Sequence, residues 1–213
     1  MDEAGEGAPL RPVEEGIADR LDARGGPTRE RLSQALREAA TADRAVYRAI
    51  ATTPMPTIDG PVRRLSNAAN RSALWLGISA ALAVFGGRSG RRAALRGLVA
   101  VGVTSAVVNQ GLKRVAERTR PDRDGAGVPE DRHVLMPTSS SFPSGHSASG
   151  FAFAAAVGRE IPALAMPLTF AAGAVAYSRV HTGVHFPGDA IVGSLVGAGL
   201  GQAVTGVLDR VGR

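Results

Sequence analysis

Hydrophobic positions follow two different patterns along this chain. Between residues 28 and 71, apolar side chains recur every three or four residues among charged ones, and this spacing predicts an amphipathic α-helix. Pro54 and Pro56 should end that helix, and a break near Asp43 is one option within it. A second short helix is expected from Pro61 to Asn70. The two helices could pack on the rest of the fold or lie in a membrane interface, and these arrangements are compatible.

From residue 72 the pattern changes to long runs with few or no charges. They cover residues 72–87, 93–113, 144–158, 161–178 and 190–208. A spanning helix needs about 20 residues, or about 17 at the short end; the last two runs reach this length, and the others do so only with polar flanks. With few aromatic residues and no strand-like alternation, the runs predict an all-α fold: a membrane-embedded helical bundle with about five spanning helices plus N-terminal amphipathic helices. A soluble all-α domain around a buried, alanine-rich bundle is the alternative.

The last run carries small residues at a regular spacing. Gly193, Gly197 and Gly201 recur every four residues, so they lie along one side of a helix. Ridges of small residues let membrane helices approach closely. We therefore expect this side of the final helix to meet another helix.

The amino-terminal third differs from the rest in its charge. Residues 1–71 contain 11 Arg against 11 Asp plus Glu. We expect residues 1–27 to form a disordered tail, because they hold too few apolar side chains to offset the cost of ordering, and nothing there resembles a signal peptide. The chain then divides into this tail, an amphipathic helical segment over residues 28–71 and a membrane domain over residues 72–213.

Composition excludes several kinds of site. The formal charge is +6, from 25 basic and 19 acidic residues, and Lys113 is the only lysine. A single lysine in so arginine-rich a chain is a modest indication that its position needs an ammonium group. There is no cysteine, which excludes disulfides, thiolate chemistry and Cys-based metal sites. The basic residues are dispersed among acids or gathered in three polar segments without an aromatic platform, so no nucleic-acid partner is expected.

The first polar segment contains two cations. Lys113 and Arg120 are seven residues apart, close to two helical turns, so both could project from one face of a helix that Pro121 ends. Two cations at the end of a helix suit a phosphate group. Basic residues in such places more often are solvated or complement the helix dipole, so this segment alone is weak support for a site.

The second segment, Pro143-Ser144-Gly145-His146, is expected to open a helix. Proline suits a helix start, and the free N–H groups of the next three residues would form an anion cradle reinforced by the helix dipole. Ser144 adds a hydroxyl donor, and His146 adds a proton donor beside it. An ordinary capped helix is the alternative interpretation.

The third segment combines Arg179, His185 and Asp189. Arg179 offers a planar fork for two phosphate oxygens. A Pro-Gly turn separates His185 from Asp189, which is expected at a helix N-cap, where its carboxylate could hold one imidazole nitrogen and leave the other free to attack. His181 is a candidate for lining the pocket, and His133 is expected at the surface. The chain makes no membrane crossing between the first and second segments, and it crosses out and back between the second and third. Counting these crossings places all three segments at the same end of the helical bundle.

Together these segments resemble the three-part signature of the type 2 phosphatidic acid phosphatase superfamily, which also includes bacterial acid phosphatases and vanadium-dependent haloperoxidases. The matching motifs are Lys113-x6-Arg120-Pro121, Pro143-Ser144-Gly145-His146 and Ser178-Arg179-x5-His185-x3-Asp189. The resemblance covers about residues 72–208, without departures at the signature positions, and leaves residues 1–71 outside it.

The resemblance implies a phosphohistidine mechanism that uses neither a metal nor a cofactor. His185 would attack phosphorus while Asp189 holds its ring, and His146 would protonate the leaving alkoxide and then help to activate water. The phosphoryl oxygens would be bound by Lys113, Arg120, Ser144, Gly145 and Arg179.

The expected function is therefore hydrolysis of a lipid phosphate by an integral-membrane phosphatase. Candidate substrates are phosphatidic acid, phosphatidylglycerophosphate and polyprenyl-linked phosphates or pyrophosphates, which the sequence does not separate. A vanadate-dependent haloperoxidase-like enzyme and a non-catalytic lipid-binding or transport protein on the same scaffold are the alternatives. The expected partners are a membrane lipid substrate and the lipid bilayer, and the oligomeric state is left open.

The membrane face that carries the site is the least determined feature. With five spans, the basic residues of segment 88–92 and of the carboxyl end lie on the membrane side opposite the site. The positive-inside rule would make that side cytoplasmic and place the site outside. Residues 1–71 would then lie outside without a signal sequence, unless one amphipathic helix enters the membrane. These arguments conflict, and we favour an extracytoplasmic site for a multi-pass protein of the cell membrane.

Overall fold

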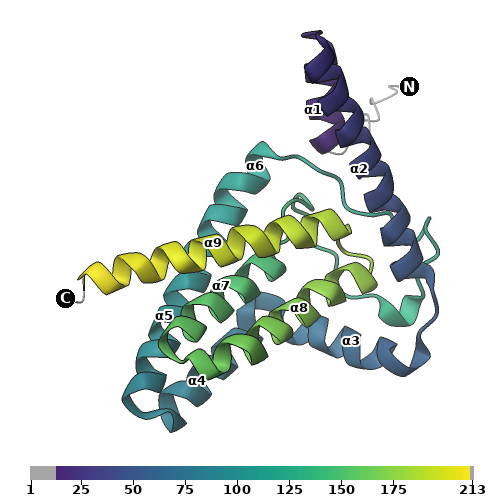
Figure 1. Ribbon diagram of the computed structural model, residues 1–213. Helices are drawn as coiled ribbons and strands as arrows, with labels where there is room; N and C mark the ends of the chain where they lie inside the picture. Colours follow the sequence, from purple (N-terminus) through teal and green to yellow (C-terminus); the bar gives the residue numbers. More distant parts are fainter. Residues whose placement is uncertain (1–12, 212–213) are drawn as a thin grey trace, which may run out of the picture.

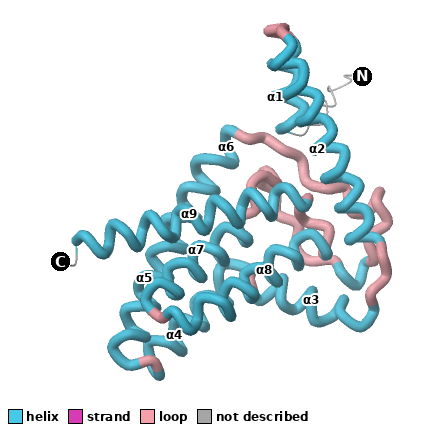
Figure 2. Tube along the Cα trace, viewed as in Figure 1, coloured by secondary structure: helices cyan, strands magenta, loops and turns pink. Residues whose placement is uncertain are grey.

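The structure, a computed structural model, describes residues 13–211 and is all-helical over that range, as the sequence predicts (Figure 1). Figure 2 shows that the helices are joined by short turns, apart from a long loop between α6 and α7. The helices are α1 (Val13–Asp22), α2 (Pro27–Thr52), α3 (Pro56–Ala68), α4 (Ala73–Phe85), α5 (Gly87–Ala106), α6 (Lys113–Val115), α7 (Gly145–Glu160), α8 (Ala165–His181) and α9 (Pro187–Val211). Shorter helical turns are η1 (Asn70–Ser72), η3 (Glu130–Arg132) and η4 (Pro162–Leu164), and a π-helical segment, η2 (Val107–Leu112), joins α5 to α6.

Helix α7 is the centre of the bundle. It packs against α5, α8 and α9, and ten of its 16 residues are buried (Figure 1). Its Phe153 ring lies 5.2 Å from that of Trp75 in α4, centroid to centroid, in the main apolar core. The uncharged run at residues 144–158 therefore reflects burial inside protein rather than contact with lipid.

Three helical rods are long and apolar enough to cross a membrane: residues 87–115, 162–181 and 187–211. A fourth is possible if α3 and α4, which are bent by 66° at their junction, count as one span. The predicted number of about five is not confirmed among the described residues. The reason is length, because α4 has 13 residues and α7 has 16, against the roughly 20 that a span needs.

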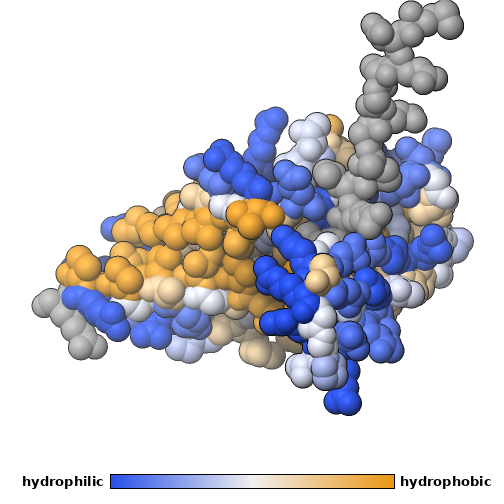
Figure 3. Space-filling view, turned by 90° about the horizontal axis from the view of Figure 1, so that it is seen from above, coloured by the Kyte–Doolittle hydropathy of each residue, from blue (hydrophilic) through white to orange (hydrophobic). Residues whose placement is uncertain are grey.

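The surface divides into an apolar and a polar region. Figure 3 shows apolar side chains gathered over one part of the molecule and hydrophilic side chains over the rest of that face. Helix α9 exposes Ile191, Leu195 and Val207 despite their size. An exposed apolar face of this kind is what a helix presents to lipid.

The amino-terminal helices differ from their prediction in several places. Of the predicted tail, residues 1–12 lie outside the described residues, but α1 occupies residues 13–22 and packs against α2. Ion pairs rather than a large apolar face order it: Arg37 bonds Asp19 at 2.8 Å and Asp22 at 2.7 Å. Helix α2 is continuous through Asp43, so the break considered there is wrong, and α3 begins at Pro56 rather than at Pro61.

The basic segment 88–92, which the breaks between the uncharged runs suggest is a loop, is part of a helix. Only Gly86 lies between α4, which ends at Phe85, and α5, which starts at Gly87. Gly87 has φ of 60°, a conformation that glycine adopts without the steric cost of a Cβ atom. The turn can therefore be so short that the arginines follow directly as the first turns of α5.

The glycine ridge of α9 meets α7, as predicted. A Cβ atom on Gly193, Gly197 or Gly201 would lie 2.5, 2.1 or 2.6 Å from the carbonyl oxygens of Ser144, Ala148 and Ala152, respectively. Both sets of contacts recur every four residues, so the two helices touch along their backbones. This close contact fixes the start of α9 against the start of α7.

Replacing Gly197 with alanine is expected to destabilise the fold by at least about 1–3 kcal/mol, because the added methyl group would press on backbone rather than on a side chain. Gly199→Ala is the matched control, since nothing lies within 4 Å of its added Cβ atom. That change should stabilise α9 by about 0.5–1 kcal/mol. Thermal unfolding in detergent would compare them, and equal melting temperatures for the two variants would contradict this packing.

Candidate active site

The three polar segments meet around a cavity of about 240 Å³. It lies where α7 and α9 begin, and the backbone N–H of Ser144 donates to the carbonyl of Asp189 at 2.9 Å across that junction. The junction of α3 and α4, the η2–α6 segment, the long loop and the start of α7 all contribute to its walls. The lining residues are Ala69, Arg71, Ser72, Ser105, Asn109, Lys113, Arg120, Pro137, Ser139, Gly145, His146, Ser149 and His185.

His185 and Asp189 form a buried pair at the base of this cavity. The Nδ1 atom of His185 lies 3.3 Å from Oδ2 of Asp189, which also accepts the backbone N–H of Phe186 at 2.9 Å. Asp189 is not the N-cap that the sequence predicts, because α9 begins two residues earlier, at Pro187. From the first turn its carboxylate reaches back to the residue before the helix, as a capping-box acid does.

This arrangement fixes the state of the imidazole. With Nδ1–H donated to Asp189, Nε2 carries the lone pair and accepts from Nη1 of Arg120 at 3.2 Å. Burial lowers the pKa of His185 to about 4, against an opposite effect of Asp189. At neutral pH the ring is therefore uncharged, and a nucleophilic nitrogen faces the cavity.

Arg120 and Lys113 meet in the cavity, but not along one helix. Helix α6 ends at Val115, and Arg120 follows in the long loop, so the predicted shared helix face is wrong. Instead, Oγ of Ser139 lies 3.2 Å from Nζ of Lys113 and 3.4 Å from Nη2 of Arg120. The long loop also accepts from Arg120 at the carbonyl of Ser139, at 2.9 Å, and holds its guanidinium beside His185. Burial lowers the pKa of Arg120 to about 10, so it remains a cation at neutral pH.

The start of α7 supplies only part of the predicted anion cradle. The N–H of Ser144 is donated to Asp189, and its hydroxyl accepts from Ser147 as an N-cap, so neither group faces the cavity as the sequence suggests. Gly145 and His146 line the cavity. As the first residues of the helix, their N–H groups lack helical acceptors and can serve an anion.

His146 also lines the cavity. Its Nε2 atom is 3.1 Å from Oδ1 of Asn70, at the junction of α3 and α4. Asn70 therefore orients this histidine from a part of the chain that the sequence did not connect with the site.

Arg179 is fully buried and only partly bonded. Its Nη1 donates to Ser66 at 2.6 Å, while Nε and Nη2 have no hydrogen-bond partner among the described residues. A buried guanidinium with two unpaired nitrogens is energetically costly unless an anion binds it. Arg179 does not line the cavity, but its charge acts on the His185 imidazole, so an anion bound beside that ring would offset it.

His181 is not a pocket residue. It is fully buried and lies outside the cavity lining, with Nε2 2.9 Å from Oδ1 of Asp59 in α3. Arg132 bonds the same carboxylate at 2.9 Å and donates to the carbonyl of Ala51 at the end of α2, also at 2.9 Å. These contacts join α2, α3, α8 and the long loop, which is a structural role. His133, expected at the surface, is partly buried, with Nε2 3.0 Å from the carbonyl of Val128.

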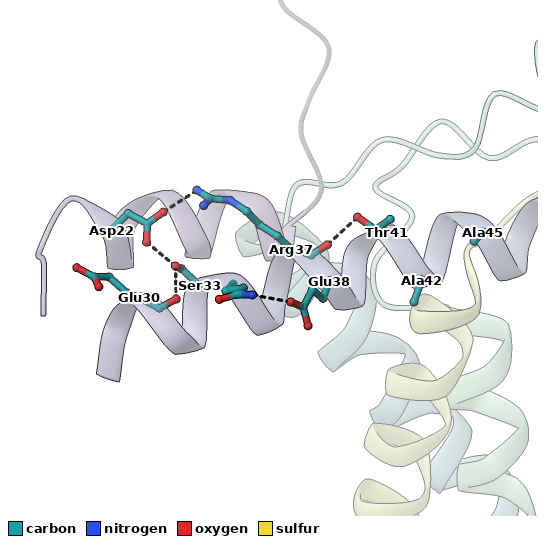
Figure 4. Close-up of a pocket in the computed structure, with 9 residues that line it drawn as sticks. Asp22, Glu30, Ser33, Arg37, Glu38, Thr41, Ala42 and Ala45 are labelled. Carbon is teal, nitrogen blue, oxygen red and sulfur yellow. Dashed lines mark hydrogen bonds and ion pairs between the residues drawn. The ribbon is translucent and has the colours of Figure 1, made fainter. Parts of the chain in front are cut away.

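A larger cavity, of about 740 Å³, lies between α1 and α2 (Figure 4). Its polar side chains bond one another: Ser33 donates to Asp22, which also pairs with Arg37, and Gln34 donates to Glu38 at 2.9 Å. The cavity thus belongs to the packing of the two helices. It is separate from the chemistry around His185.

Sequence reasoning missed several residues of the site. Asn70 and Arg71 form the polar break between amphipathic α3 and apolar α4, Asn109 precedes Lys113 by one helical turn, and Ser139 belongs to a serine run before Pro143. Asn109 and Ser139 were signalled only as polar residues beside a predicted site segment, and Asn70 and Arg71 only as a polar break between helices. Arg118, within the first segment, donates from Nη1 to Oδ1 of Asp189 at 2.7 Å and was also missed.

Known proteins are similar to this chain in sequence and in fold. A model of the PAP2 superfamily matches residues 93–213. The decaprenylphosphoryl-5-phosphoribose phosphatase of Mycobacterium tuberculosis is 38% identical over 96 residues, which cover 45% of this chain and 51% of that protein, so the match spans about half of the relative's length. The protein of the same name from Mycolicibacterium smegmatis is 33% identical over 138 residues, covering 62% of this chain and 68% of the relative.

Two solved structures share the arrangement of helices. The transmembrane PAP2-type phosphatidylglycerolphosphate phosphatase of Bacillus subtilis has a TM-score of 0.61 and 22% identity, over 93% of this chain and 95% of the other. The LpxE structure of Aquifex aeolicus has a TM-score of 0.59 and 25% identity, over 76% of this chain and 93% of the other.

Proposed function

Because the chain belongs to the PAP2 superfamily, we propose that it is a membrane phosphatase that removes a phosphoryl group from a lipid. The observation that carries this proposal is the buried Arg179 guanidinium, which has two unpaired nitrogens among the described residues and whose charge acts on a neutral His185. Lys113 and Arg120 add positive charge at the cavity. The carboxylate of Asp189 accepts from Nδ1 of His185, on the side of the ring away from Nε2. A phosphoryl group would satisfy the cations and present its phosphorus to Nε2.

The reaction follows from the position of each group. His185 Nε2 attacks phosphorus, the bond to the leaving alkoxide breaks, and that alkoxide takes a proton from His146. Burial and the nearby cations lower the pKa of His146 without substrate, and the anionic phosphoryl group offsets those cations so that this histidine can carry the proton. Asp189 stabilises the positive charge that develops on the His185 ring. In the second step a water molecule gives a proton to His146 and attacks phosphorus, which breaks the N–P bond and frees His185. Lys113, Arg120, Arg179 and the N–H of Gly145 stabilise charge on the phosphoryl oxygens in both steps.

The relatives indicate which lipid to test first. Two of them are named for a decaprenylphosphoryl-5-phosphoribose substrate, in which a sugar phosphate is linked to a polyprenyl lipid. We propose a lipid-linked phosphomonoester of this class as the substrate, with phosphatidic acid, phosphatidylglycerophosphate and polyprenyl pyrophosphate as comparisons.

Phosphate release from these lipids by the protein in vesicles tests the proposal. We expect one lipid class to be preferred and a labelled phosphoenzyme to survive alkali and be lost in acid, as a phosphoramidate does. Inhibition by vanadate, which resembles the phosphoryl transition state, should accompany it. Absence of phosphate release from every lipid, or a label with the stability of an acyl phosphate, would contradict the proposal.

We further propose that the chain crosses the membrane several times and carries its site on the extracytoplasmic face. Arg88, Arg91, Arg92 and Arg159 lie toward the turns at the end of the bundle away from the site, and Glu160 pairs with Arg92 there at 2.8 Å. An excess of arginine marks the cytoplasmic end of spanning helices. The α1–α2 hairpin, also rich in arginine, lies on the side of the site.

Cysteine labelling would test this orientation, because the chain has no native cysteine. With a membrane-impermeant thiol reagent on intact cells, Asp124→Cys should react and Ser89→Cys should not. Asp124 lies in the long loop on the side of the site, with an 83% exposed side chain, and Ser89 lies at the other end. Reaction of Ser89→Cys alone would place the site in the cytoplasm.

A further inference from the structure

The carboxylate of Asp189 is held from two sides. Oδ2 takes the His185 ring and the Phe186 N–H, whereas Oδ1 accepts from Nη1 of Arg118 at 2.7 Å. The side chain of Arg118 is only 1% exposed, and that of Asp189 is fully buried. Since a buried carboxylate needs a partner for its charge, Arg118 stabilises the ionised form of the acid that orients His185.

Arg118 is in turn held by the amino-terminal hairpin. Its Nη2 donates to Oδ2 of Asp43 in α2 at 2.7 Å, and Glu14 of α1 lies 3.5 Å from Nη1. The other oxygen of Asp43 accepts the backbone N–H of Gly188 at 2.7 Å. Asp43 therefore bonds both the arginine that holds Asp189 and the residue directly before Asp189.

The same side of α2 contacts the loop a second time. Tyr47, one helical turn after Asp43, packs edge-on against Phe186 with ring centroids 5.2 Å apart. The guanidinium of Arg118 lies over the ring of Phe186, with its carbon atom 4.4 Å from the ring centroid. Residues 185–189 are thus packed between Arg118 and one face of α2. Helix α2 lies outside the part of the chain that the family model matches.

We propose that Asp43 and Arg118 are positioning residues for His185, so that the α1–α2 hairpin completes the active site. This inference rests on the proposed phosphatase function. Asp43 fixes Arg118, Arg118 fixes Asp189, and Asp189 holds the His185 ring with Nε2 directed at the substrate. The hairpin acts on catalysis through these bonds without touching the phosphoryl group.

The charges of Arg118 and Asp43 should affect the pH dependence of kcat/KM, which a purely structural role of these residues would leave unchanged. His185 is faced by Asp189 on its Nδ1 side and by Arg120, Lys113 and His146 around the cavity, and the charge of buried Arg179 also acts on it. Removing the Arg118 charge leaves Asp189 uncompensated, which favours the imidazolium and moves the acid limb of kcat/KM to higher pH, by about one unit. Removing the Asp43 charge acts in the opposite direction and more weakly.

The test compares two buried Arg–Asp pairs of the same burial. Arg118→Met and Asp43→Asn break the proposed network, whereas Arg132→Met and Asp59→Asn break a pair whose side chains are equally buried, 0% and 8% exposed against 1% and 10%. We expect the first two to lower kcat by about 10- to 100-fold with little change in KM, the range typical of residues that orient a functional histidine from behind. The acid limb of kcat/KM should move to higher pH in Arg118→Met and to lower pH in Asp43→Asn. Arg118→Lys should recover part of kcat.

The control pair should lower the melting temperature but leave kcat and the limb of the folded protein unchanged. If Asp43→Asn does not fold, Gly188→Ala serves instead, since its added Cβ atom would press on Oδ2 of Asp43 at 3.1 Å. Equal kcat and pH profiles for both pairs, with an active wild-type protein, would overturn the inference while leaving the phosphatase assignment intact. A wild-type protein that releases no phosphate would instead contradict the proposed function itself.

Discussion

Replacing His185 with alanine is expected to lower phosphate release by at least about 10⁴-fold, the loss typical of removing a catalytic nucleophile. The change removes the atom that forms the bond to phosphorus, while Arg120, Lys113 and Arg179 can still bind the phosphoryl oxygens. The substrate should therefore still bind, and the labelled phosphoenzyme should disappear. Phosphate release in vesicles and trapping of the labelled protein measure both effects.

His133→Ala is the matched control for this experiment. His133 belongs to the long loop and bonds the carbonyl of Val128, away from the cavity lining. Its replacement should leave both phosphate release and the phosphoenzyme close to the wild-type level. A His185→Ala protein that folds normally and keeps its activity would exclude the proposed mechanism.

Replacing Arg179 with methionine is expected to lower kcat/KM by about 10³-fold and, at the same time, to raise the stability of the protein. The loss follows from removing a cation that stabilises the charge of the transferring phosphoryl group. The gain follows from burial, because Nε and Nη2 have no partner among the described residues and methionine fills a similar volume without a charge. We expect a gain of about 1–4 kcal/mol in the free energy of unfolding without substrate.

Arg132→Met separates this effect from the general cost of changing a buried arginine. Arg132 is also fully buried, but its Nε forms an ion pair with Asp59 and its two terminal nitrogens donate to the carbonyls of Ala51 and Thr53. Its replacement leaves the two carbonyls without this donor and buried Asp59 without a permanent cation, and it should destabilise the fold by about 3–5 kcal/mol. Denaturant unfolding in detergent measures both variants, and a loss of stability in Arg179→Met would show that its charge is satisfied without a ligand.

The membrane prediction shows how far hydropathy reaches. Low charge density sets residues 72–213 apart from the charged amino-terminal third, and the all-α fold that the runs predict is confirmed over the described residues. Charge density could not distinguish a run that faces lipid from one that faces other helices. The run containing α7 is uncharged because α5, α8 and α9 surround it, whereas α9 exposes apolar side chains on the bundle surface. Both environments exclude charge for the same physical reason, so span counting from the sequence was unreliable.

By itself, the sequence determined the parts of the site that act over one or two helical turns. His185 and Asp189 are four residues apart across a turn, and the start of α7 follows from its proline, serine and glycine. Their contacts are local, so residue type and spacing were enough to predict that they form. The glycine ridge of α9 is another local pattern, and it correctly indicated close contact with a second helix.

Only the tertiary structure decided what surrounds that local pair. Arg118 reaches Asp189 across 71 residues, Asn70 reaches His146 across 76, and Asp43 reaches Arg118 across 75. Such contacts depend on how a long loop folds back and on which helix faces pack together, and neither leaves a periodic signal in the chain. The unpaired guanidinium of Arg179 is of the same kind, because burial and missing partners are properties of the packed molecule and not of any one residue.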